Sequence, residues 1–196
     1  MKNKLIGLAI LLTLALPGIS AAATTVYVVN AMDNSTSDGG VGLEVDVFAG
    51  NTFSILASSS DYWNAGDLPR WSNANGLTGD LIASGTADIT GDNPGAEFDL
   101  VGVAFPTWTQ NGLTAPYGML VGQFGSGNFF KIGTSYTGTA TDNKLKLFYF
   151  DSNNFDNTGS IRVRVTAVPE PETYAMMLAG LGLIGFMSRR RKNAQV

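Results

Sequence analysis

The segment KLKLFYFDSNNFDNTGSIRVRVTA, residues 144–167, has the clearest strand pattern of the chain, and we call it the deciding segment. In residues 144–151 leucine and tyrosine alternate with lysine, and in residues 160–167 isoleucine and valine alternate with arginine. Successive side chains of a β-strand point to opposite faces, so a period of two indicates strands with one buried face. The segment therefore predicts two strands joined by a polar loop.

Alternating patterns recur upstream of this segment. Residues 43–47 and 52–57 each alternate, and a Gly-Asn pair lies between them, which predicts a β-hairpin. Further strands are expected at residues 25–30, 97–104, 118–124 and 129–138. No window of the central region has helical amphipathicity, and the spacing of turns fits about eight strands. The sequence thus predicts an all-β fold, a single β-sandwich domain of the jelly-roll or galactose-binding-like kind.

The composition excludes several classes of function. The chain has no cysteine and no histidine, which excludes disulfides, thiolate metal sites, a Ser-His-Asp triad and HExxH zinc sites. Residues 24–168 hold 14 acidic and 6 basic side chains, a balance of −8, which repels a phosphate backbone. We therefore expect neither an enzyme nor a partner made of nucleic acid.

Residues 1–23 are typical of a secretory signal peptide. Lys2 and Lys4 precede an apolar run at residues 5–16, and three alanines end the segment. An alternative interpretation is a buried first helix. With cleavage after the alanines, residues 24–168 form the mature domain of an exported protein.

Residues 169–196 form a second targeting segment. In order, it contains Pro169, Glu170, Pro171, an uncharged stretch at residues 174–188, and the basic cluster Arg189, Arg190, Arg191 and Lys192. The uncharged stretch would extend about 22 Å as a helix, short of a hydrocarbon core of about 30 Å. The basic cluster acts as a membrane stop, because positive charge holds that end on the cytoplasmic side. The segment therefore predicts a short transmembrane helix. A helix docked on the domain is disfavoured, because the stretch has no polar face.

These three parts, in this order, resemble the PEP-CTERM sorting domain of bacterial exported proteins, over roughly residues 167–192. The resemblance implies recognition by an exosortase, a membrane peptidase-transferase that cuts near the Pro-Glu-Pro segment. It further implies a chain anchored transiently in the membrane and then passed to the cell surface or extracellular matrix. Proteins of this kind accompany exopolysaccharide and biofilm production, and the chain would be the substrate of the exosortase.

The loop between the two strands of the deciding segment is rich in oxygen ligands. Residues 151–157 contain two carboxylates and three amides. Such hard oxygen ligands suit calcium rather than zinc or copper. The glycine and glutamate positions of an EF-hand are missing. The alternative is a polar turn whose asparagine and aspartate side chains bond their own backbone.

The central domain also resembles the galactophilic lectins of the PA-IL type, over roughly residues 43–167. The resemblance rests on the run APYGMLVG at residues 115–122, the Gly-Ser-Gly turn at 125–127, the aspartate-rich loop into Gly159 and Ser160, and, less specifically, residues 64–71. It implies a small β-sandwich in which one calcium ion coordinates two sugar hydroxyls.

Carried over by position, this resemblance implies calcium ligands at Asp151, Asn154 (through its backbone), Asp156 and Asn157, with a partner carbonyl near Asn64 or Ala65. The chain departs from the family in three ways. The sugar-contacting histidine has no counterpart, Asp156 stands where an amide is usual, and the loop is one or two residues shorter. The resemblance therefore supports calcium binding more strongly than it supports galactose binding.

Two functions remain open from the sequence. In the first, the domain is a calcium-dependent module that binds exopolysaccharide or galactose-like sugars. In the second, it is a structural matrix protein without a ligand. Trp63, Trp71 and Trp108 offer rings that stack on sugars, with core or sheet-edge packing as the alternative.

Overall fold

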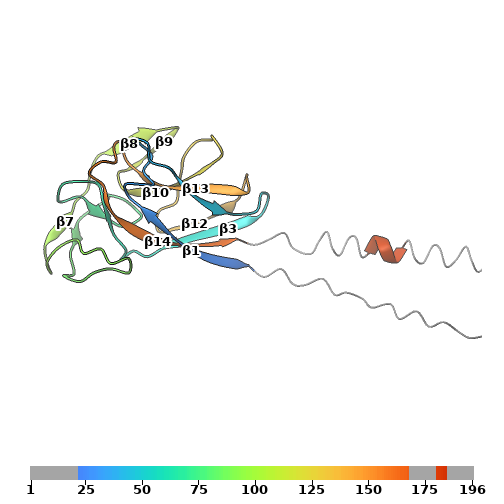
Figure 1. The fold of residues 1–196 in the computed structure, drawn as a ribbon, viewed down its shortest axis with the longest axis horizontal. Coiled ribbons are helices and arrows are strands. Elements are labelled where there is room, and N and C mark those ends of the chain that lie inside the picture. Colours follow the sequence, from blue (N-terminus) through green and yellow to red (C-terminus); the bar gives the residue numbers. More distant parts are fainter. Residues whose placement is uncertain (1–21, 168–179, 185–196) are drawn as a thin grey trace, which may run out of the picture. The chain divides into compact units, whose positions relative to one another are not determined.

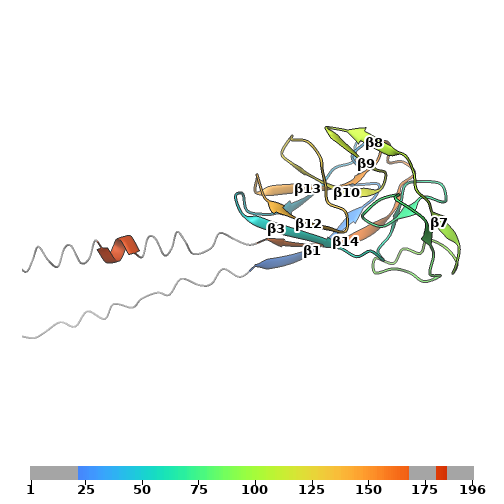
Figure 2. The ribbon, with the colours of Figure 1, turned by 180° about the vertical axis from the view of Figure 1, so that it is seen from behind.

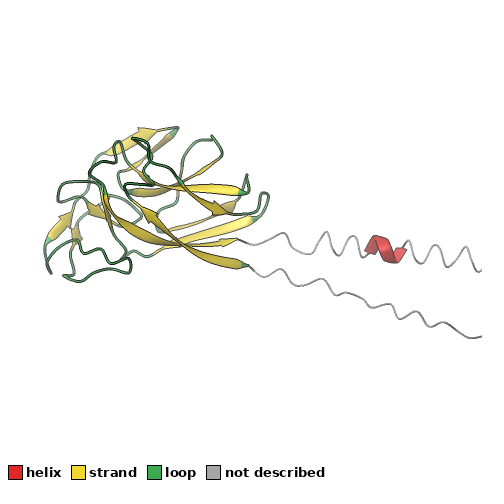
Figure 3. Cartoon of the chain, in the orientation of Figure 1, coloured by secondary structure: helices red, strands yellow, loops and turns green. Residues whose placement is uncertain are grey.

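The computed structural model describes residues 22–167 and 180–184 of the chain. The expected signal peptide, the Pro-Glu-Pro segment and the basic cluster lie outside these residues. Residues 180–184, within the expected transmembrane stretch, are helical and exposed (red in Figure 3). Among the described residues, no helix has both the length and the apolar character needed to cross a membrane.

Residues 22–167 fold into β-strands joined by loops (Figure 3). The strands are β1 (Ala23–Asn30), β2 (Leu43–Asp46), β3 (Thr52–Ala57), β4 (Trp63–Asn64), β5 (Trp71–Ser72), β6 (Leu81–Ile82), β7 (Leu100–Gly102), β8 (Thr107–Gln110), β9 (Leu113–Pro116), β10 (Met119–Phe124), β11 (Phe130–Lys131), β12 (Ser135–Thr139), β13 (Lys144–Phe150) and β14 (Thr158–Ala167). This confirms the predicted all-β fold and both strands of the deciding segment.

Two larger sheets form the sandwich. The six-stranded sheet has the order β12-β3-β14-β4-β5, with β1 also paired to β14, and the four-stranded sheet has the order β11-β10-β13-β2. All pairings between these strands are antiparallel. In Figures 1 and 2, β1, β3, β12 and β14 form one layer, and β10 and β13 lie in the other. Two small sheets, β6-β7 and β8-β9, lie outside this pair.

One apolar core fills the space between the two layers. Ile55 and Val163 reach it from the six-stranded sheet, and Leu120 and Leu147 from the four-stranded sheet. A second buried cluster, which includes Phe148, involves the opposite face of β13. That strand is therefore buried on both faces at its carboxyl end, where the alternation predicted only one buried face.

The predicted hairpin between residues 43–47 and 52–57 is wrong. β2 pairs with β13, whereas β3 pairs with β12 and β14, so the intervening residues cross from one sheet to the other. The backbone N–H of Gly50 donates to the carbonyl of Ala140 at 2.8 Å, which ties the crossing to the loop before β13. The alternating pattern shows which face of each strand is buried. It is the same whether the two strands pair as a hairpin or lie in different sheets, so it could not reveal the pairing.

The expected strand at residues 129–138 is also wrong as a single element. It is divided into β11 and β12 by Gly133, whose φ of +65° turns the backbone. The N–H groups of Ile132 and Gly133 both donate to the carbonyl of Leu120. The pattern of residues 129–138 gave no sign of the turn at Gly133, and for this reason one strand was predicted where there are two.

Trp63 links the core to the end of the sandwich that carries the polar loop. Its side chain is fully buried, and its ring lies edge-on to the Tyr149 ring with centroids 4.6 Å apart. Its indole Nε1–H donates to the carbonyl of Gly118 at 2.8 Å. Of the two interpretations of the tryptophans, core packing is the correct one for Trp63.

We expect the substitution Trp63→Phe to lower the free energy of unfolding by about 3 kcal/mol. The change leaves a cavity and also removes the donor from a buried carbonyl. Urea denaturation followed by circular dichroism measures the loss. Trp108→Phe is the control: that side chain is 36% exposed, so its loss should stay below about 1 kcal/mol. Equal losses for the two variants would contradict the assignment of Trp63 to the core.

Candidate functional site

The polar loop at residues 151–157 connects β13 in one sheet to β14 in the other, across one end of the sandwich. The first residues of β14 pair with β4, with Thr158 opposite Asn64. This pairing brings the loop beside residues 64–70. The structure therefore places Asp151, Asn154, Asp156 and Asn157 on one loop, next to the segment in which a partner carbonyl was expected.

A third segment, residues 31–38, holds the loop in place. The Thr36 hydroxyl donates to the carbonyl of Asp151 at 2.9 Å and accepts the N–H of Asp151 at 3.1 Å. The amide nitrogen of Asn157 donates to the carbonyl of Ala31 at 3.3 Å, and that of Asn154 donates to the carbonyl of Met32 at 3.3 Å. The carbonyl of Asn154 accepts the N–H of Asn157 at 3.2 Å. The loop is therefore anchored through its backbone and amide nitrogens.

Five buried side-chain oxygens at this end have no hydrogen-bond donor among the described residues: Asn64 Oδ1, Asp151 Oδ2, Asn153 Oδ1, Asp156 Oδ1 and Asn157 Oδ1. We call them the acceptor cluster. The amide orientations of Asn64 and Asn157 are consistent with this arrangement, because each nitrogen donates to a backbone carbonyl. Buried polar atoms normally have partners, so acceptors without donors point to a cation as the complement.

Asp156 joins the polar loop to residues 64–70. Gly66 has a φ of +105°, and a Cβ atom at this position would overlap the carboxylate oxygen Oδ2 of Asp156. The carboxylate therefore lies directly against the glycine backbone. Asn64 reinforces the turn, because its amide nitrogen donates to the carbonyl of Gly66 at 2.6 Å.

The electrostatics of the site are set by burial of its carboxyl groups. Asp151 is 3% exposed, and this burial raises its pKa to about 6; the charge of Asp156 adds to the rise, and hydrogen bonds such as that from the Ser152 N–H oppose it. The pKa of Tyr149 is well above its ordinary value, because the phenol is buried and faces the charges of Asp151 and Asp156. The end of the core thus lies in a negative potential.

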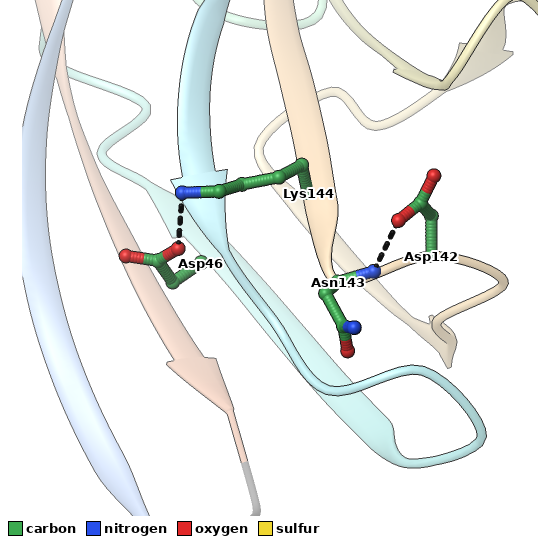
Figure 4. A network of polar contacts seen from close by, with 4 residues as sticks. All are labelled: Asp46, Asp142, Asn143 and Lys144. Carbon is green, nitrogen blue, oxygen red and sulfur yellow. Dashed lines mark hydrogen bonds and ion pairs between the residues drawn. The ribbon is translucent and has the colours of Figure 1, made fainter.

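Among the described residues, no basic side chain forms an ion pair with these carboxyl groups. Within the described part of the chain, the only ion pair is Lys144 with Asp46, at 2.6 Å (Figure 4). Lys144 begins β13, whereas Asp151 follows the end of that strand. The described residues also contain no group of three acidic, histidine or cysteine side chains placed to hold a metal. The acceptor cluster has two carboxylates, and amides supply the rest.

A pocket of about 210 Å³ opens beside the acceptor cluster. It is lined by Ala65, Arg70, Leu77, Phe105, Tyr117, Asp151, Ser152 and Asn153. The rings of Phe105 and Tyr117 meet edge-on at 5.5 Å, and Trp108 lies tilted against Tyr117 at 6.2 Å. The pocket thus has one polar wall formed by the loop and one aromatic wall.

Several residues of this site were not predicted from the sequence. Asn153 and the side chain of Asn64 belong to the acceptor cluster, and Arg70, Phe105 and Tyr117 line the pocket. Asn153 belongs to the polar loop, so the amide-rich composition of that loop could have identified it as a ligand. Phe105 lies far from the loop in sequence, and no spacing rule brings it to the pocket.

Comparison with known protein families supports the resemblance that we describe at the carboxyl terminus. The family profile of the PEP-CTERM protein-sorting motif matches residues 167–192, which confirms the resemblance noted there. The protein is therefore of the exported class. More particularly, it carries a PEP-CTERM sorting motif and is processed by an exosortase.

No curated protein matches the chain. Among solved structures, the chain is similar to the N-terminal domain of EclA, a PllA-like lectin, with 20% sequence identity and a TM-score of 0.40. The similarity covers 71% of this chain and 92% of that one.

The raised pKa of Asp151 predicts a pH dependence of stability in the presence of a chelator. A folded-state pKa of about 6, above the ordinary 3.8, means that the proton stabilises the fold. This stabilisation is complete below about pH 4 and is lost as the pH rises through about 6. We expect it to amount to about 2 kcal/mol between pH 4.5 and pH 7, measured by urea denaturation.

The variant Asp151→Asn removes this titration, so its loss of stability over the same pH range should be smaller by that amount. The exposed Asp80 gives the control, and Asp80→Asn should behave as the wild-type protein does. Any background slope from Asp61, whose pKa burial also raises, is common to all three proteins. Identical slopes for wild type and Asp151→Asn would contradict the assignment.

The sorting motif predicts a processing defect. Replacement of Pro169, Glu170 and Pro171 by alanine should leave the chain inserted in the membrane but uncleaved, because the apolar stretch and basic cluster are intact. Immunoblots of membrane and surface fractions measure the two forms. Processing at the normal rate would show that the exosortase does not need these residues.

Proposed function

We propose that the domain at residues 24–168 is a calcium-dependent carbohydrate-binding module, exported and then retained among exopolysaccharide at the cell surface or in the matrix. The observation that carries the proposal is the acceptor cluster, five buried oxygens without a donor among the described residues. A structural turn would bond these oxygens to its own backbone. Here Asp151 Oδ1 accepts the N–H of Ser152 in this way, but the five oxygens of the acceptor cluster do not bond the backbone.

Calcium is the cation that suits this donor set. The cluster offers carboxylate and amide oxygens, and the chain has neither histidine nor cysteine to favour a softer metal. Calcium accepts six to eight oxygens in flexible geometry, whereas magnesium demands a strict octahedron. Of the expected ligands, Asp151, Asp156 and Asn157 offer side-chain oxygens to such an ion, and Asn153 and Asn64 extend the set.

The pocket beside the cluster supports a sugar as the ligand. Asp151 and Asn153 contribute to both the pocket and the acceptor cluster, so an ion held there would face the cavity. Sugar hydroxyls are oxygen ligands of the kind that calcium binds. The rings of Phe105 and Tyr117 give an apolar wall for the C–H face of a sugar ring. No histidine is available, so the contacts to the sugar differ from those of galactophilic lectins.

Calcium should raise the thermal midpoint of the purified domain. An ion that binds only the folded state stabilises it by about 2.7 kcal/mol at a hundredfold excess over its dissociation constant. It also removes the repulsion between Asp151 and Asp156. Asp151→Asn should lose most of the shift, whereas Asp80→Asn should keep it.

These melts, in millimolar calcium and in excess chelator, are paired with a glycan array under the same two conditions. Calcium-dependent binding to the array supports the proposal. Coincident wild-type midpoints would reduce the loop to a polar turn. The domain would then be a structural matrix protein, and its sorting motif would be its specific function.

A further inference from the structure

We infer that the sugar bound at this site is an acidic one, and that the guanidinium of Arg70 binds its carboxylate. The inference rests on the proposed function and names the substrate class of the same pocket. It starts from Arg70, a basic side chain that lines the same pocket as the carboxyl group of Asp151.

The fold holds Arg70 at the pocket. Its carbonyl accepts the N–H of Ala65 at 3.1 Å, which closes the loop after β4, and its backbone forms a bridge with Gly102. The guanidinium lies over the Phe105 ring, with its central carbon 5.2 Å from the ring centroid. A guanidinium stacked in this way keeps its N–H groups, which lie in its plane, available at its edge.

Among the described residues, the guanidinium of Arg70 has neither an ion pair nor a hydrogen bond. Asp156 is a candidate partner, because its carboxylate and Arg70 Nη1 both approach Gly66. Among the described residues the two groups nevertheless form no ion pair, and Asp156 Oδ1 is one of the unpartnered oxygens of the acceptor cluster. Arg70 therefore offers planar, bidentate donors to a ligand in the pocket.

The balance of charge in the pocket changes when a cation binds. A divalent ion offsets the charges of Asp151 and Asp156, and Arg70 then leaves an excess of positive charge in the pocket. A neutral sugar does not use this charge, whereas a carboxylate forms charge-assisted hydrogen bonds with it. Without the cation, the two aspartates repel the same carboxylate. Binding of an acidic sugar is therefore coupled to calcium more strongly than binding of a neutral one.

The volume of the pocket suits one sugar unit. About 210 Å³ is less than the 300–1,000 Å³ or so of pockets that hold drug-sized molecules. A single uronic acid residue, at the end of a chain or as a side branch, would place hydroxyls toward the acceptor cluster and its carboxylate toward Arg70.

The test compares sugars that differ only at C6. Methyl galactoside is paired with methyl galacturonide, and methyl glucoside with methyl glucuronide, because the pocket does not fix the hydroxyl configuration. Isothermal titration of the domain in saturating calcium gives the dissociation constants. We expect the acidic member of at least one pair to bind about tenfold more tightly. Excess chelator should abolish its binding.

The variant Arg70→Gln should reduce this ratio to about one, and Arg70→Lys should give an intermediate ratio because it keeps the charge but loses the bidentate geometry. Arg164→Gln is the matched control, since Arg164 is an exposed arginine on β14 outside the pocket. A merely structural brace of Arg70 on Phe105 would change the thermal midpoint but not the ratio.

Each outcome separates the inference from the proposed function. Calcium-dependent binding of both members with equal affinity, or a ratio unchanged in Arg70→Gln, overturns the inference and leaves the proposed function in place. A calcium-dependent midpoint without binding of any of the four sugars overturns the inference but not the cation site, and the glycan array then decides the role in sugar binding. No effect of calcium and no binding overturns all three.

Discussion

The pairing of β14 with three other strands is the constraint on which both the core and the site depend. Its first two residues pair with β4, residues 160–167 pair with β1, and residues 163–167 also pair with β3. Val163 and Val165 carry the core along this strand. The pairing of Thr158 with Asn64 also fixes the distance between the two loops that form the site. A shift of register by one residue would therefore turn the core side chains outward and, at the same time, move the two loops apart.

The acceptor cluster places unpaired hydrogen-bond acceptors at the end of the apolar core, where burial of such groups is unfavourable. Asp151 and Asn157 are buried at the end of the core, where burial first and then the charges of Asp151 and Asp156 raise the pKa of Tyr149. Unpaired buried acceptors each cost about 1–3 kcal/mol, so the folded domain carries this strain only because the rest of the sandwich outweighs it. The proposed cation site would account for these unpaired acceptors, because an ion bound there would take them as ligands.

Features set by neighbouring residues could be predicted from the sequence, whereas features set by residues far apart in the chain could not. The strands of the deciding segment were predictable because Leu145 and Val163 repeat a period of two, and the oxygen-rich loop because its residues are consecutive. The partner of each strand was not predictable, since alternation is blind to pairing, and the hairpin after residue 47 was wrong for that reason. Arg70 and Phe105 come together only through the fold, so the wall of the pocket had no signal in the sequence.

The position of the site along β14 has a consequence for the sorted protein. Ala23 pairs with Ala167, so the first and last strands of the domain have their outer ends side by side (Figure 1). Thr158, next to the acceptor cluster, lies at the other end of the ten-residue strand, about 30 Å away at roughly 3.3 Å per residue. A domain retained through the segment after Ala167 would therefore have its attachment and its pocket at opposite ends of one strand. Under the proposed function, this separation would keep the retained end of the domain away from the pocket.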